Sequence, residues 1–307
     1  MSNISPGRLR GVLAPVLTPF HDNFEPNFEA FIAHCRWLVS QGVGLAIFGT
    51  NSEANSLSVT ERLALTDALL EADIDPARMM PGTGCCSIKD TIELTRHAVN
   101  AGAAGVLMLP PFFYKNVSED GVFGFYSEVI EAVGDARLAV YLYHIPALSS
   151  VPISVSLIER LRVRYPATVV GAKDSSGNWE NTRAMIGEFA RDGFDVFPAS
   201  EAFLTDAVAL GGAGCISATA NVNPAMLDTL YRHANEPADT QLKDRAIAIR
   251  NVFQSQPMIP AMKHVIARWS GEASWRNVRP PLIRIEHAEG LKLDGALSAL
   301  RFRIDGP

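Results

Sequence analysis

Short apolar runs of the kind that form buried β-strands alternate with amphipathic stretches through most of the chain. Several of these runs are apolar on both alternating faces, as expected of parallel strands that have helices on one side and packed side chains on the other. Strands and helices that follow one another in this order build a parallel α/β sheet. The eight runs comprise residues 12–17, 43–48, 79–82, 105–109, 138–143, 168–172, 194–198 and 214–217.

Eight strand–helix units favour a closed barrel over an open sheet. Ser58, Ser87 and Ser118 each precede a helical pattern and have the side chain expected at a helix N-terminus. The alternative is an open, doubly wound sheet that binds a dinucleotide, and it would place a GxGxxG turn after its first strand. No such turn follows residues 12–17. The sequence therefore predicts an α/β protein built as a (β/α)8 TIM barrel.

The β pattern stops near residue 224. The stretches 225–235, 238–254, 258–269 and 290–301 then have helical spacing, with prolines between several of them. We expect a barrel catalytic domain in residues 1–224 and a helical extension in residues 225–307 that packs on the barrel.

Composition and charge exclude several classes of protein. Hydrophobic residues make up 48% of the chain, which is enough for a sizeable core. The net charge of -6 argues against a nucleic-acid partner, because phosphate binding needs clustered basic residues. No run reaches the roughly 18 apolar residues of a membrane span, and the N-terminal segment lacks the apolar stretch of a secretory signal, so we expect a cytoplasmic protein without a membrane partner. The four cysteines follow neither a disulfide nor a zinc spacing, and we expect them to be small buried residues.

Lys173 and Tyr143 close two neighbouring strands, and the active site of a TIM barrel lies at the carboxyl ends of its strands. Because Lys173 follows an apolar run, its amine is expected to be poorly hydrated, which favours the neutral form. A neutral amine attacks a carbonyl group, and the protonated imine that results accepts electrons from the neighbouring carbon. Tyr143 is placed to relay a proton to the substrate oxygen. The alternative is that Lys173 pairs with a carboxylate, for instance Asp174, and only holds the end of the strand.

Residues 49–54 (GTNSEA) follow the second strand and combine small residues with hydroxyl, amide and backbone N–H groups. Such a turn, which Gly49 opens, suits the binding of a carboxylate. The alternative is an ordinary turn between strand and helix, in which the same groups cap the helix.

The strand-end residues resemble the dihydrodipicolinate synthase / N-acetylneuraminate lyase family of pyruvate-dependent class I aldolases. The resemblance runs over most of the chain in ordered motifs. They are residues 17–20 (LTPF), 49–53 (GTNSE), 110–114 (PPFFY), 143–146 (YHIP), 171–177 (GAKDSSG) and 211–217 (GGAGCIS).

The resemblance implies roles for individual residues. Lys173 would form the Schiff base, and Tyr143 would be the proton relay. Thr50 and Asn51 would bind the carboxylate of a small-molecule 2-oxo acid, and Ile216 would line its pocket. The family is usually a homotetramer, a dimer of dimers, and it uses neither a metal nor an organic cofactor because the lysine itself supplies the electron sink.

The sequence departs from the family pattern at three positions. Ser52 stands where the family usually has glycine. Phe113 aligns with the tyrosine that a neighbouring subunit usually lends to the relay, and it has no hydroxyl, so that either Tyr114 substitutes or the relay runs through Thr50 and water. Leu148 stands where the synthases that condense pyruvate with aspartate semialdehyde have an arginine, and leucine cannot replace that bidentate carboxylate clamp.

Ser200 and Glu201 follow the seventh strand, in the region where the sialic acid lyases bind the polyol of their substrate. By this likeness, Glu201 would hydrogen-bond the hydroxyl groups of a sugar acid. The alternative is that its carboxylate caps the helix that follows, where the helix dipole stabilises a negative charge.

We therefore expect a Schiff-base-forming lyase that acts on pyruvate or a 2-keto-3-deoxy sugar acid by aldol cleavage, condensation or dehydration. A 4-hydroxy-tetrahydrodipicolinate synthase, which condenses pyruvate with aspartate semialdehyde, is an alternative within the same class. A metal-dependent aldolase would need ligands at the strand ends, where His144 is the only one of the seven histidines. A non-catalytic 2-oxo acid sensor on the same barrel is an alternative of another class.

Overall fold

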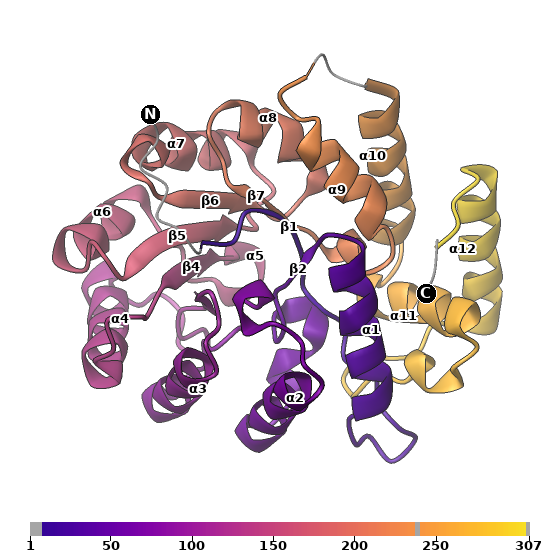
Figure 1. Cartoon of the computed structure of the whole chain (residues 1–307), viewed down its shortest axis with the longest axis horizontal. Helices are drawn as coiled ribbons and strands as arrows, with labels where there is room; N and C mark the ends of the chain where they lie inside the picture. The colour runs from indigo at the N-terminus through magenta and orange to yellow at the C-terminus, as the bar shows by residue number, and fades with distance from the viewer. Residues whose placement is uncertain (1–7, 237–239, 305–307) are drawn as a thin grey trace.

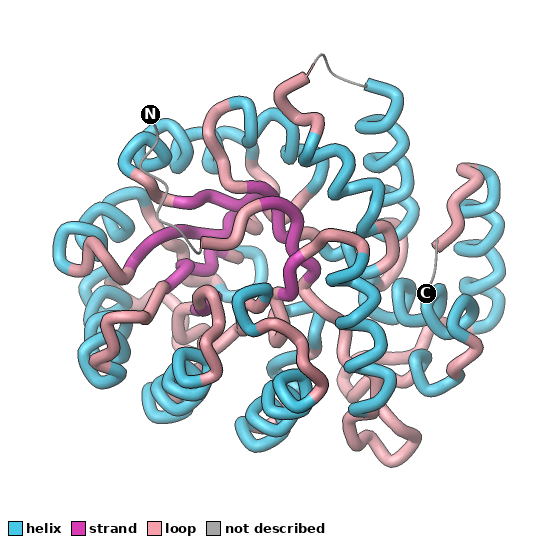
Figure 2. The backbone as a smooth tube through the Cα atoms, viewed as in Figure 1, coloured by secondary structure: helices cyan, strands magenta, loops and turns pink. Residues whose placement is uncertain are grey.

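The computed structural model describes residues 8–236 and 240–304, and it has short parallel strands at its centre with helices around them (Figure 1, Figure 2). In one set, β1 lies between β2 and β7, and the other set has the order β3-β4-β5-β6. All of these pairings are parallel. The strands are β1 (Gly11–Ala14), β2 (Gly44–Leu45), β3 (Val106–Met108), β4 (Val140–His144), β5 (Val169–Asp174), β6 (Asp195–Pro198) and β7 (Gly214–Ile216).

Backbone hydrogen bonds join the two sets into a ring. Residues 79–83 lie between β2 and β3: the Met80 N–H donates to the carbonyl oxygen of Leu45 at 2.8 Å, and the Thr83 N–H donates to that of Leu107 at 3.1 Å. On the other side, the Ala213 N–H donates to the carbonyl oxygen of Val196 at 3.0 Å, which links β6 to β7. The predicted run 79–82 thus takes the third place in the barrel, although only isolated bridges hold it. The TIM barrel that the sequence predicts is confirmed.

Helices follow the strands as expected. Ser58, Ser87 and Ser118 each accept a backbone N–H from the first turn of the helix they precede, as predicted for N-cap residues. The helices of the barrel are α1 (Phe28–Ser40), α2 (Val59–Glu71), α3 (Ile88–Asn100), α4 (Glu119–Val133), the short α5 (Pro146–Ser149), α6 (Val155–Arg164), α7 (Trp179–Phe189), α8 (Leu204–Ala209) and α9 (Pro224–Arg232).

Alternation along the strands separates the interior of the barrel from the layer beneath the helices. Tyr141 and Tyr143 of β4 pack inside the barrel with Phe197, whereas Leu142 packs outward with the helices. A Cβ atom built on Gly171 would lie 2.4 Å from Cδ1 of Tyr141, so only glycine leaves room for this ring. The large aromatic side chains fill the interior of the barrel, so that a substrate can bind only near the carboxyl ends of the strands.

The C-terminal extension consists of α10 (Thr240–Gln254), α11 (Met258–Ser270) and α12 (His287–Ala299), on one side of the barrel in Figure 1. Residues 238 and 239, predicted as the start of a helix, lie outside the described residues. The predicted boundary at residue 224 falls at the first residue of α9, which packs against β1 and α8. The division of the chain at that residue stays a prediction.

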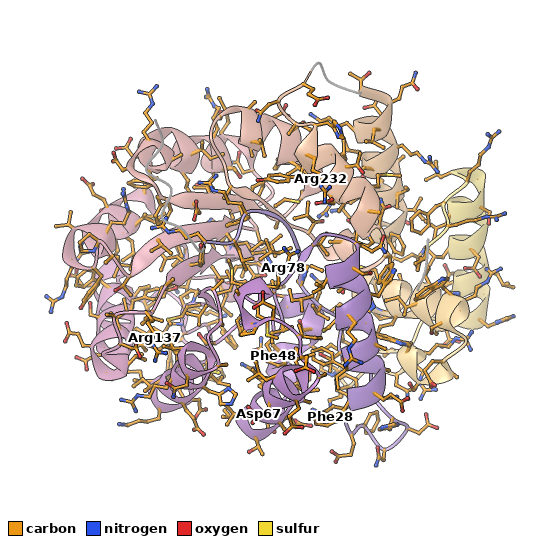
Figure 3. All side chains as sticks on the ribbon, in the orientation of Figure 1. Phe28, Phe48, Asp67, Arg78, Arg137 and Arg232 are labelled. Atoms are coloured by element: carbon orange, nitrogen blue, oxygen red, sulfur yellow. The ribbon has the colours of Figure 1, made fainter. Side chains whose placement is uncertain are left out.

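Charged side chains lie on the outer helices and loops, as Asp67 and Arg137 do in Figure 3. Within residues 8–236 and 240–304, no helix is both long and apolar enough to cross a membrane. The four cysteines are free thiols, and Cys35 and Cys215 are buried as predicted. Cys85 is only partly buried and Cys86 is exposed, contrary to the prediction, because both lie in the segment before α3 and not in a strand or helix.

Candidate active site

Lys173 extends from β5 into the interior of the barrel and is only 2% exposed. It pairs in the parallel register with Tyr143 of β4, so the two side chains leave neighbouring strands at the same level. The Nζ of Lys173 donates to the Tyr143 hydroxyl at 3.2 Å and lies 4.3 Å from the centroid of the tyrosine ring. The two residues that the sequence singled out are therefore in direct contact.

Thr50 completes a chain of three polar groups. Its Oγ1 lies 3.0 Å from the Tyr143 hydroxyl oxygen. Burial acts to raise the pKa of the Tyr143 phenol, but the charge of Lys173 and the hydrogen bonds from Thr50 and Lys173 outweigh burial, and the pKa lies below its ordinary value. A phenol in contact with both an amine and a hydroxyl is well placed to pass a proton between them.

Asp174 points to the opposite face of β5 from Lys173, because side chains alternate along a strand. Its Oδ2 accepts hydrogen bonds from Asn181 at 3.0 Å and from Thr182 at 2.7 Å. Its Oδ1 lies 4.0 Å from the Nε2 of His144, whose Nδ1 accepts the Ile153 N–H at 2.9 Å. Lys173 makes no ion pair with Asp174 or with another carboxylate among the described residues, so the alternative in which this lysine only holds the strand end by such a pair is wrong. His144 is held by hydrogen bonding beside the strand end.

Residues 49–53 form a tight turn over the end of β2. The Ser52 hydroxyl accepts the Gly49 N–H at 3.1 Å, so this serine closes the turn where the family usually has glycine. The Thr18 hydroxyl donates to the Ser52 carbonyl oxygen at 2.8 Å. Asn51 is partly exposed, and its side chain makes no hydrogen bond within the described part of the chain. The turn thus places Thr50 at Tyr143 and leaves an amide group available.

Glu201 is buried after β6, and its carboxylate is surrounded by donors. Its Oε2 accepts from Ser217 at 2.5 Å and from Nη1 of Arg250 at 2.7 Å, and Thr219 donates to Oε1. Ser200, and not Glu201, caps the short helix that follows, by accepting the Ala202 N–H at 3.2 Å. The capping alternative for Glu201 is therefore wrong, and its role in substrate binding stays a prediction.

Phe113 and Tyr114 lie in the loop that follows β3, and Leu148 lies on the short helix α5 that follows β4. They are 72%, 73% and 62% exposed, and the rings of Phe113 and Tyr114 meet edge to face with centroids 5.4 Å apart. Ile216, by contrast, is buried at the end of β7 inside the barrel. Within the chain, Tyr114 makes no contact with Tyr143 among the described residues, so the replacement of the relay tyrosine by Tyr114 stays a prediction.

Sequence reasoning missed several residues near the site. Ser175 has a buried hydroxyl that helps to lower the pKa of the Tyr143 phenol, and its place two residues after Lys173 on the same strand face was a signal for it. Arg250 and Lys263 reach the barrel from α10 and α11. Nothing in the local sequence of these helices points to the strand ends.

Comparison with known proteins agrees with this architecture. The model of the dihydrodipicolinate synthetase family matches residues 8–300. A DapA-like lyase of Chloroflexus aurantiacus is 30% identical over 291 residues, which cover 94% of this chain and 95% of that protein.

Solved structures of this family are similar along nearly the whole chain. The crystal structure of dihydrodipicolinate synthase from Agrobacterium tumefaciens has a TM-score of 0.88 and 33% identity, covering 96% of this chain and 100% of that one. A prophage protein of the dihydrodipicolinic acid synthase family from Escherichia coli, solved in complex with pyruvate, has a TM-score of 0.86 and 25% identity, covering 96% and 99%. The chain therefore belongs to the dihydrodipicolinate synthetase family, and it is an enzyme of the lyase class.

Proposed function

We propose that the enzyme is a class I aldolase or lyase that binds pyruvate, or a 2-keto-3-deoxy sugar acid, as a Schiff base on Lys173. The observation that carries the proposal is the contact between the buried Nζ of Lys173 and the Tyr143 hydroxyl, at 3.2 Å, with Oγ1 of Thr50 at 3.0 Å from the same hydroxyl. An amine removed from water and free of a carboxylate partner is suited to attack a carbonyl group.

The chemistry follows from these three groups. In its deprotonated form, the amine of Lys173 adds to C2 of the 2-oxo acid, and the carbinolamine loses water after a proton reaches its oxygen through Tyr143. In the cleavage direction, the protonated imine takes up the electron pair of the C3–C4 bond while the C4 hydroxyl gives its proton to Tyr143, which releases an aldehyde and leaves an enamine. Protonation of C3 and addition of water to the imine then release pyruvate and the free lysine.

The turn of residues 49–52 is proposed to hold the substrate carboxylate. Thr50 and Asn51 offer a hydroxyl and an amide beside Tyr143, and Ile216 offers an apolar wall across the barrel. The pyruvate complex of the related Escherichia coli protein supports the choice of a 2-oxo acid. No metal and no organic cofactor are required, since the imine is itself the electron sink.

Condensation of pyruvate with aspartate semialdehyde is the second candidate, favoured by the similarity to the Agrobacterium tumefaciens synthase. Leu148 argues against it, because an exposed leucine offers no cation to a second carboxylate. A comparison of sugar acids with aspartate semialdehyde as substrates also tests whether Glu201 binds sugar hydroxyls.

We also propose a homotetramer in the cytosol. The exposed pair of Phe113 and Tyr114 beside the mouth of the barrel is an apolar surface of the kind that a second subunit covers. Four free cysteines are compatible with a reducing compartment. Sedimentation at several protein concentrations tests the assembly.

An assay of pyruvate release tests the proposed function. Sialic acid, 2-keto-3-deoxygluconate and related sugar acids are supplied one by one, and the condensation of pyruvate with aspartate semialdehyde is measured in parallel. Turnover of a sugar acid that Lys173→Ala abolishes supports the proposal, with Lys243→Ala as the control for loss of a lysine elsewhere. Turnover of aspartate semialdehyde alone favours the synthase, and pyruvate binding without any turnover favours a sensor.

A further inference from the structure

Glu53 lies directly after the turn that contains Thr50 and Asn51, and its side chain contacts residues of the C-terminal extension. It adopts a left-handed backbone conformation, with φ of 55°, which is uncommon for a residue with a side chain. Its carboxylate is buried: Oε1 contacts the Nζ of Lys263, and Oε2 accepts the Arg279 N–H at 2.9 Å. Both oxygens of this carboxylate are therefore fixed.

Lys263 is a fully buried residue of α11, far from the turn in sequence. Besides Glu53, its Nζ donates to the carbonyl oxygen of Asn277 at 2.8 Å and lies 4.5 Å from the centroid of the Phe20 ring. Burial lowers the pKa of Lys263 to about 8, while the charge of Glu53 acts to raise it. The ammonium group, and with it the ion pair, persists at neutral pH.

A second contact holds the same turn from the side of β1, because the Thr18 hydroxyl donates to the Ser52 carbonyl oxygen at 2.8 Å. The Asn277 Nδ2 donates to the carbonyl oxygen of Phe20 at 2.8 Å, which ties the C-terminal extension to the segment that follows Thr18. The turn is thus fixed at Ser52 by the barrel and at Glu53 by the extension. Because Thr50 must lie within hydrogen-bond distance of Tyr143, a small shift of the turn breaks that contact.

We propose that Lys263, through its buried ion pair with Glu53, positions the turn of residues 49–52 so that Thr50 and Asn51 meet the substrate carboxylate. Lys263 and Glu53 are positioning residues, since neither touches the reacting atoms. The proposal rests on the proposed function for its substrate, but the geometry it concerns is a property of the free protein. It gives the C-terminal extension a part in binding the 2-oxo acid.

The first measurement is the pyruvate concentration that gives half-maximal trapping of the imine by borohydride, in full-length Lys263→Met and wild-type protein. We expect this concentration to rise at least tenfold, because Glu53 loses its buried partner and the turn of residues 49–52 moves away from Tyr143. Two variants are controls. Lys243→Met removes an exposed ion pair of α10 with Asp206, and Leu297→Ala destabilises the buried face of α12 without touching the turn. In both controls the concentration should stay within twofold of wild type.

The second measurement does not depend on imine formation. Tyrosine is labelled with carbon-13 at the ring carbon that carries the hydroxyl, and the NMR signal of Tyr143 is identified by its loss in Tyr143→Phe. The change of this signal with pH gives the pKa of the Tyr143 phenol, which depends on the hydrogen bond with Thr50. Loss of that bond in Lys263→Met moves the titration to higher pH, because the bond lowers the pKa of the phenol. If Lys263→Met does not fold, Glu53→Gln is measured in its place. We then expect the titration of Tyr143 to move in the same direction by a smaller amount.

Unchanged pyruvate saturation together with an unchanged Tyr143 titration in a folded variant overturns the positioning role. A shift equal in Leu297→Ala and Lys263→Met overturns it as well, since general loss of stability then explains the effect. If even the wild-type protein forms no imine, the proposed function fails, and the Tyr143 titration alone decides whether Lys263 positions the turn.

Discussion

The buried ion pair of Glu201 and Arg250 allows a quantitative test of how the extension stabilises the barrel. The Glu201 side chain is fully buried, the Arg250 side chain is 12% exposed, and Nη1 of the arginine lies 2.7 Å from the carboxylate. Arg250→Met leaves the negative charge with only the two hydroxyl donors of Ser217 and Thr219. Removal of one partner of a buried pair costs about 3–5 kcal/mol.

The assay is urea-induced and thermal unfolding at fixed protein concentration and neutral pH. A destabilisation of about 3–5 kcal/mol corresponds to a fall of the melting temperature by roughly 6–20 °C, since one kcal/mol moves it by about 2–4 °C in large single domains. Glu201→Gln should cost less than Arg250→Met, because the remaining guanidinium still reaches water. A variant with both Arg250→Met and Glu201→Gln should be more stable than Arg250→Met alone, because it no longer buries an unpaired carboxylate charge.

A loss of less than about 1 kcal/mol of unfolding free energy in Arg250→Met would contradict this expectation. A variant with both Arg250→Met and Glu201→Gln that is no more stable than Arg250→Met alone would contradict it as well. Either result would mean that solvent already compensates the Glu201 carboxylate. The pair would then resemble a surface ion pair in its energy.

Three further predictions concern the relay, the response to acid and the barrel interior. Tyr143→Phe should lower kcat for pyruvate release by roughly 10²-fold or more while borohydride still traps an imine, and steady-state assays beside mass spectrometry check this. Burial lowers the pKa of His34 to about 4, so the unfolded chain binds a proton at a higher pH than the folded protein does. The free energy of unfolding should therefore fall by up to roughly 3 kcal/mol as the pH drops from about 6.5 to 4. Urea unfolding across this pH range measures the fall, and His34→Gln should reduce it. Gly171→Ala should cost about 1–3 kcal/mol in the same assay because its Cβ meets the Tyr141 ring, whereas Gly187→Ala in open space on α7 should stabilise the protein by about 0.5–1 kcal/mol.

The central site could be predicted from the sequence because its residues terminate strands. Lys173 and Tyr143 follow apolar runs, and the ends of neighbouring parallel strands meet at one edge of a barrel. The same reasoning found the turn that begins at Gly49. The run 79–82 was also placed correctly in the barrel, although it is held only by bridges and its Pro81 has no N–H group to donate.

The rest of the site depends on contacts between segments far apart in the chain. Arg250 lies on an amphipathic helix, where a basic residue is usually solvated, and only the packing of α10 brings it to Glu201. The partners of Glu53 come from α11 and from the backbone at Arg279. The helix-cap interpretation of Glu201 was wrong for the same reason, because local sequence cannot reveal a donor from another helix.

The most direct test of the account is reduction with borohydride in the presence of pyruvate, followed by peptide mass spectrometry. We expect one reduced pyruvyl group on Lys173, with the buried Lys263 left unmodified because Glu53 holds it as an ammonium ion. An adduct on another lysine, or the absence of any adduct from an enzyme that still releases pyruvate, would contradict it.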